Sequence, residues 1–109
     1  MKINHLDELK NLIQNHKEKG IRYGKSLDFL LKRIKRTKED VEHDIFSLNN
    51  LEHIEKQEKS GETRFVLFFV HTKRKGIEYV LTFKDKIVII TAFPLGKRTL
   101  IRYRKKRFI

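Results

Sequence analysis

The chain has no cysteine and no tryptophan, and it has one proline in 109 residues. Without cysteine it can form neither a disulfide nor a thiolate metal site. No apolar run approaches the roughly 20 residues that a helix needs to cross a bilayer. The N-terminal sequence MKINHLDELKNLIQ lacks the apolar core of a secretory signal. We therefore expect a cytoplasmic protein with no membrane association.

Acidic residues are scarce in the last part of the chain. Residues 63–109 hold 13 Lys or Arg and 2 acids, whereas residues 1–62 hold 13 basic and 12 acidic side chains. Scattered surface lysine explains a basic average but not this asymmetry. A one-sided positive charge favours a polyanionic partner: nucleic acid, an anionic membrane or an acidic protein. The Arg-rich end RTLIRYRKKR favours nucleic acid among these.

Four runs in the last third predict a sheet. They are TRFVLFFVH, IEYVLTF, KIVIITAF and RTLIRYRKKR, and the turn-like segments TKRKG, KD and PLGK separate them. Their β-branched and aromatic residues indicate consecutive antiparallel strands joined by hairpins. The polar, weakly alternating run 51–59 predicts either an edge strand or an extended loop before them.

The first 48 residues show helical periodicity. Apolar residues recur at three- and four-residue spacing over 5–19, and the segment 20–24 between two glycines indicates a loop. Ser26 suits the N-cap of a second helix, whose expected buried side chains are Phe29, Leu30, Leu31 and Ile34. Thr37 and Asp40 have the spacing of a capping box, which predicts a third helix over about 38–48. A single kinked helix in place of the last two is the open alternative.

This order of elements predicts an α+β protein. We expect a single domain over 1–109, with a helical part at about 5–48 and a basic antiparallel sheet at about 51–107. Two or three N-terminal helices would pack on one face of a four- to five-stranded antiparallel meander.

Acidic and histidine residues offer no familiar metal site. The five histidines are scattered without ligand spacing, so we expect no metal and no other cofactor. The acids of the third helix fit a solvated helix face better than acid–base chemistry, and they are Glu39, Asp40, Glu42 and Asp44. Pro94-Leu95-Gly96-Lys97 indicates a hairpin turn rather than a phosphate-binding loop.

What remains is a metal-free set of basic and aromatic residues on the predicted sheet. RNA cleavage by 2′-OH attack needs a base, cations for the developing phosphorane charge and an acid for the leaving oxygen. His71, at the end of the first strong strand, is the candidate base, and its alternative is an exposed strand-end histidine. Arg98, Arg102 and Arg104 are candidates to clamp a phosphate, with plain solubility or unspecific binding as the alternative.

Two tyrosines complete the candidate set. Tyr79 and Tyr103 can each donate a proton or stack on a base, although core packing explains Tyr79 better because it shares a strand face with apolar residues. The candidate catalytic residues are thus His71, Arg98, Arg102 and Tyr103. The candidate nucleic-acid contacts are Lys73, Arg74, Lys75, Lys97, Arg104, Lys105, Lys106 and Arg107.

These patterns resemble the RelE-type ribonuclease fold, whose superfamily includes barnase, EndoU and several colicin toxins. FLLKRIKRTKEDVEHDI is similar to the helical pattern of small toxin-like members, through Arg33, Arg36, Thr37, Asp40 and Val41. KIVIITAFP, with Thr91-Ala92-Phe93, resembles a strand of phage and toxin nucleases. The resemblance covers about residues 26–104.

The resemblance implies a metal-independent endoribonuclease of toxin–antitoxin type, with RNA favoured over DNA and an acidic antitoxin or inhibitor as partner. Members commonly carry a histidine at the start of the basic helix, where this chain has Asp28-Phe29. Either His71 or His53 substitutes for it, or the reaction runs on Arg, Lys and Tyr as in RelE. The remaining alternatives are a non-catalytic nucleic-acid-binding protein and a module that binds an acidic protein.

Overall fold

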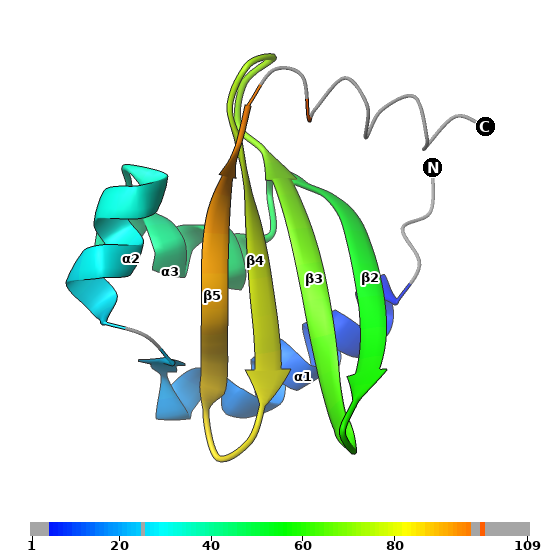
Figure 1. Ribbon diagram of the computed structural model, residues 1–109. Coiled ribbons are helices and arrows are strands. Elements are labelled where there is room, and N and C mark those ends of the chain that lie inside the picture. The colour runs from blue at the N-terminus through cyan, green and yellow to red at the C-terminus, as the bar shows by residue number, and fades with distance from the viewer. Residues whose placement is uncertain (1–4, 25, 97–98, 100–109) are drawn as a thin grey trace.

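The structure is a computed structural model that describes residues 5–24, 26–96 and 99. Within them it is an α+β protein of three α-helices and a five-stranded mixed sheet (Figure 1). In chain order the elements are α1 (Leu6–His16), the 3-10 helix η1 (Lys17–Lys19), β1 (Ile21–Tyr23), α2 (Leu27–Ile34), α3 (Lys38–Ser47), β2 (Leu51–Lys59), β3 (Glu62–Val70), β4 (Gly76–Phe83) and β5 (Ile87–Leu95). None of the helices in these ranges is long and apolar enough to span a bilayer.

The sheet has the strand order β1-β5-β4-β3-β2, and its last four strands form the expected antiparallel meander. The run 51–59 is the edge strand β2. The short strand β1 pairs parallel with β5, so the sheet is mixed and the prediction of a purely antiparallel sheet is wrong. The predicted last strand, in RTLIRYRKKR, lies outside the described residues.

The strand β1 lies in the segment that was predicted to be a loop. Its three residues are too few to show an alternating pattern. Gly24 continues the pairing, because its N–H donates to the Ile89 carbonyl at 2.8 Å. A Cβ on Gly24 would lie 3.3 Å from that same oxygen. Glycine thus permits the close approach of two backbones, a reason that no local pattern reveals.

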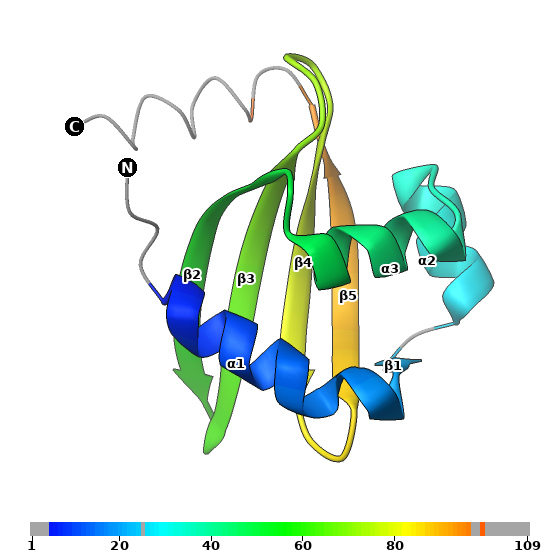
Figure 2. The same ribbon diagram turned by 180° about the vertical axis from the view of Figure 1, so that it is seen from behind.

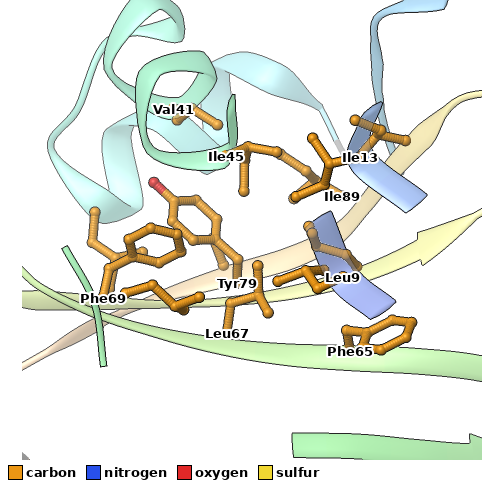
Figure 3. Packing of buried hydrophobic residues seen from close by; sticks show 14 of the residues in the cluster. Leu9, Ile13, Val41, Ile45, Phe65, Leu67, Phe69, Tyr79 and Ile89 are labelled. Atoms are coloured by element: carbon orange, nitrogen blue, oxygen red, sulfur yellow. The ribbon is translucent and has the colours of Figure 1, made fainter. Parts of the chain in front are cut away.

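The helices α1 and α3 cross one face of the sheet, and no helix of the described residues crosses the other face (Figures 1 and 2). α2 lies beyond β5 and packs against it. Leu9, Val41 and Ile45 of α1 and α3 are fully buried against Leu67 and Tyr79 of the sheet (Figure 3). Full burial of one such aliphatic side chain stabilises the fold by about 1.5–3 kcal/mol.

A local signal explains where α3 begins. The Thr37 hydroxyl accepts from the Asp40 N–H at 3.1 Å, and the Asp40 carboxylate accepts from the Thr37 N–H at 3.1 Å. This capping box confirms that α2 and α3 are separate helices. Ser26 occupies the N-cap of α2 but makes no side-chain capping bond. Phe29 was expected to be buried; it is instead exposed, because Leu30 and Ile34 form the buried side of α2.

The end of β5 corrects another prediction. Pro94 and Leu95 are not in a hairpin turn, since they pair with Ile77 and Gly76 of β4. Pro94 lies beyond the part of β5 that pairs with β1, so among the described residues β4 is its one neighbouring strand, and such an edge position tolerates proline.

Candidate functional site

Three segments distant in sequence meet at one end of the sheet and form a pocket. They are the C-terminal end of α2, the β3–β4 loop and the end of β5 (Figure 1). The pocket has a volume of about 540 Å³. Five cationic residues line it, together with His71: Arg33, Lys35, Arg36, Arg74 and Lys75. No Asp or Glu among the described residues lines it, so the pocket attracts anions.

The β3–β4 loop is held in shape by Thr72. Its hydroxyl accepts from the N–H groups of Arg74 at 3.2 Å and Lys75 at 3.0 Å. The His71 N–H donates to the Lys75 carbonyl at 3.0 Å and closes the loop at its base. Lys73, Arg74 and Lys75 are all exposed. The loop therefore presents three cations on an ordered turn.

A buried carboxylate lies next to the pocket. Asp44 of α3 is 1% exposed, and both its oxygens accept from His71 Nε2 at 3.0 Å. The Tyr79 hydroxyl donates to Asp44 Oδ2 at 2.9 Å, and Arg36 Nη2 lies 3.5 Å from the same oxygen. A carboxylate that is shielded from solvent needs such partners, because burying an unpaired charge destabilises the folded state. Asp44 thus links the pocket to the core.

His71 has one orientation in this arrangement. A carboxylate only accepts hydrogen bonds, so the contact with Asp44 places a proton on Nε2 and leaves the lone pair of the neutral ring on Nδ1. No described residue hydrogen-bonds to Nδ1. The ring stacks on Phe69 with centroids 6.2 Å apart and planes at 11°. The side chain is 12% exposed and lines the pocket, as a positioned base would.

Tyr79 is a buried partner of this site and does not reach solvent. Its ring packs edge-on against Phe69, and its hydroxyl points toward α3 (Figure 3). Burial raises the pKa of Tyr79 strongly, and the Asp44 charge raises it further. Tyr79 therefore stays protonated and donates to Asp44. This confirms core packing as its role and excludes it as a base-stacking surface.

The uncovered face of the sheet differs from the pocket in charge. Residues paired directly across the strands share a face, which places Glu78 beside Phe68 and Phe93, and Glu55 in line with Val66 and Val80. Burial raises the pKa of Glu78, and Glu55 raises it further. Within the part of the chain that is described, five cations line the pocket, whereas the open face carries acids and cations together, Arg64 among them.

The structure brings together three residues of the predicted set, His71, Arg74 and Lys75. Lys73 belongs to the same loop but does not line the pocket. The other predicted residues lie outside the described residues: Arg98, Arg102 and Tyr103 of the catalytic set, and Lys97, Arg104, Lys105, Lys106 and Arg107 of the nucleic-acid contacts.

Sequence reasoning missed Asp44, which was assigned to a solvated helix face. That assignment is wrong, because Asp44 follows Val41 by three residues and so shares its buried side of α3. This spacing was the available signal. Lys35 was not singled out, and Arg33 and Arg36 entered only through the family resemblance. Nothing local to α2 indicates that its last turn faces the β3–β4 loop.

No family model, curated protein or solved structure matches this chain. The resemblance to RelE-type ribonucleases therefore stays a prediction. In residues 5–24, 26–96 and 99, no group of three His, Asp or Glu is placed to hold a metal ion. The case for function rests on the geometry of the pocket.

Proposed function

We propose that this protein is a small endoribonuclease that cleaves RNA by 2′-OH attack without needing a metal. One observation carries the proposal: His71, oriented by the buried Asp44, lines a pocket with five cations and no described acid. A positioned imidazole and a cluster of cations are two of the three elements that this reaction needs.

In the proposed reaction, Nδ1 of His71 takes the proton of the 2′-OH. The 2′ oxygen then forms a bond to phosphorus, the bond from phosphorus to the 5′ oxygen breaks, and the products are a 2′,3′-cyclic phosphate and a 5′-OH. Arg36, Arg74 and Lys75 line the space around His71 and would stabilise the added negative charge on the phosphorane.

Asp44 would act through His71. It holds the ring in one orientation and fixes the proton on Nε2, and its charge stabilises the imidazolium that forms when Nδ1 takes a proton. The leaving 5′ oxygen needs a proton from a second group. We propose Tyr103 for this role and Arg98 and Arg102 for the phosphate clamp, as the sequence predicts.

A second candidate is nucleic-acid binding without cleavage. Asp44 also contacts Tyr79 and Arg36, so the same network fastens α3 and the end of α2 to the sheet. In this reading His71 is a structural partner of Asp44, and the cations bind phosphates through counterion release. An acidic antitoxin or inhibitor protein would occupy the same cationic pocket in either case.

The test is a cleavage assay on labelled RNA in EDTA. The proposal expects 2′,3′-cyclic phosphate ends and no cleavage of a strand whose scissile nucleotide is 2′-deoxy. His71→Gln places an amide near the Nε2 position but offers no base, so cleavage should fall by roughly 10²–10⁴-fold while RNA binding stays. Tyr79→Phe is the matched control, because it removes another hydrogen bond to Asp44 and leaves His71 in place.

The outcomes separate the two candidates. Intact RNA with clean, salt-sensitive binding would contradict the nuclease and support the binding protein. If Tyr79→Phe and His71→Gln lose cleavage equally, the loss reports a weakened fold and not a missing base.

A further inference from the structure

Two large aromatic side chains are exposed beside the pocket. Phe29 of α2 is 54% exposed and Phe93 of β5 is 42% exposed, and they stand out among the large hydrophobic side chains of the described chain. The core does not need them, since Leu30 and Ile34 bury α2 and Ala92 buries this part of β5. Their rings remain available to a partner.

Arg33 joins the two rings to each other. Its guanidinium carbon lies 4.6 Å from the centroid of Phe29 and 5.2 Å from that of Phe93. Nη1 donates to the Thr91 hydroxyl at 3.4 Å, which holds the guanidinium against β5. Cation–π attraction of this kind orders all three side chains as one surface. We call Phe29, Arg33 and Phe93 the aromatic platform.

The aromatic platform is continuous with the pocket. Arg33 belongs to both, and Pro94 and Leu95, which follow Phe93 directly, line the pocket. A ligand that places an anion among the pocket cations therefore has two exposed aromatic rings next to that anion. A nucleotide has this combination of a phosphate and a planar base.

Charge decides which part of a nucleotide lies where. Glu78 pairs directly with Phe93 across β4 and β5. Arg33, the cation of the platform, lies over the Phe93 ring. A phosphate over Phe93 would be repelled by the neighbouring Glu78 carboxylate, whereas a neutral base would not be repelled. The phosphate is thus directed to the pocket and the base to the rings.

We propose that the aromatic platform binds an unpaired base of the RNA whose phosphates occupy the pocket, so that the protein selects single-stranded RNA. This inference rests on the RNA binding of the proposed function but not on cleavage. In a duplex the bases are stacked on one another, and their faces are closed to protein side chains. A single strand can turn a base onto Phe29 or Phe93.

The experiment uses Phe93→Trp in the full chain. The protein has no tryptophan, so this residue becomes the sole indole reporter. Fluorescence is titrated with a single-stranded RNA of about 10 nucleotides and with a duplex of the same strand length. We expect strong quenching by the single strand and little by the duplex.

Affinity measurements on variants without the tryptophan reporter complete the test. Phe29→Ala and Phe93→Leu should each weaken single-strand binding by roughly 5- to 150-fold, the range of one lost base stack, and change duplex binding little. Phe93→Tyr keeps the ring and should bind like the parent. Arg74→Ala should weaken both forms of RNA, because a phosphate contact does not depend on unpaired bases.

Each outcome decides the inference. Salt-sensitive RNA binding that Phe29→Ala and Phe93→Leu leave unchanged would overturn it and spare the proposed function. Quenching by an acidic peptide but not by RNA would make the platform a protein-docking surface. A parent protein that binds no RNA ends both proposals, whereas single-strand binding without cleavage ends only the nuclease.

Discussion

The pocket and the open face of the sheet share the strands β4 and β5, yet the carboxylates beside them have different surroundings. Next to the pocket, Asp44 is almost fully buried and has His71, Tyr79 and Arg36 as partners. On the open face, Glu78 is half-buried beside Phe68 and Phe93, and burial raises its pKa. Burial of a carboxylate is therefore not enough to place it at a functional site; its hydrogen-bond partners matter as well. The partners turn a buried acid into a positioning group.

The largest expected effect comes from removing the charge of Asp44. Asp44→Asn no longer fixes the proton on His71 Nε2, so we expect cleavage to fall by roughly 10²–10⁴-fold. The lost charged hydrogen bonds should also lower the free energy of unfolding by about 1–3 kcal/mol. Cleavage rates and urea unfolding of the same preparation measure the two effects.

Tyr79→Phe sharpens this prediction. It removes one donor to Asp44 and should lower the free energy of unfolding by about 1–2 kcal/mol, with cleavage within a few-fold of the parent. If Asp44→Asn loses stability but keeps cleavage, then Asp44 is only structural and the contrast with Glu78 disappears.

The next effect is on RNA affinity. Replacing Arg74 and Lys75 with alanine removes two cations that line the pocket, so affinity should fall and the salt dependence of binding to a single strand should drop by roughly 0.7 per cation. Lys84 and Lys86 lie at the β4–β5 turn, at the opposite end of the sheet (Figure 1). Their double alanine variant removes the same charge and is the matched control.

Equal losses in the two double variants would show that total charge, and not the pocket, binds the RNA. Filter binding over a series of salt concentrations distinguishes the outcomes, because it yields affinity and slope together.

A smaller effect concerns the helix that carries Asp44. Thr37→Ala removes the hydroxyl that caps α3 and should lower the free energy of unfolding by about 1 kcal/mol. The hydrogen bonds with Thr37 hold the pKa of Asp40 below its usual 3.8. This stabilisation is therefore complete above pH 3.8 and is lost as the pH falls through the lower pKa of the folded state. The Thr37 N–H remains in Thr37→Ala, so Asp40→Ala tests the Asp40 half of the box: its cost in urea unfolding should be smaller near pH 3 than at pH 7, and a constant cost would contradict this half.

The smallest effect concerns the open face. The folded-state pKa of Glu78 is raised, so its ionised form is disfavoured and the folded state loses stability as the pH rises above 4.5. Glu78→Gln should stabilise the protein by about 0.5 kcal/mol at pH 7. It should have no effect well below pH 4.5, where Glu78 is protonated in both the folded and the unfolded state. Glu58→Gln, in the exposed part of β2, is the control, because Gln keeps an oxygen that can accept from the Thr63 hydroxyl. A loss of stability in Glu78→Gln would mean that Glu78 has a partner as strong as those of Asp44.

Local sequence determined the elements that short spacings define. The repeats of α1, the capping box at Thr37 and the β-branched and aromatic runs of β3 and β4 depend on neighbours within a few residues, and each predicted its element correctly. His71 at the end of a strand and the cations that follow it were also visible in the sequence, because they are adjacent in it.

Only the tertiary structure decided which of these residues meet. Asp44 and His71 are 27 residues apart, and Arg33 and Thr91 are 58 apart, so their contacts depend on how α2 and α3 pack on the sheet. The pairing of β1 with β5 likewise joins segments distant in sequence, and it includes a close backbone approach at Gly24. Periodicity fixes which side of an element is apolar. The packing of the apolar sides of helices and strands against each other determines which polar groups are buried among them. The packing of α3 on the sheet places Asp44 beside His71 in this way.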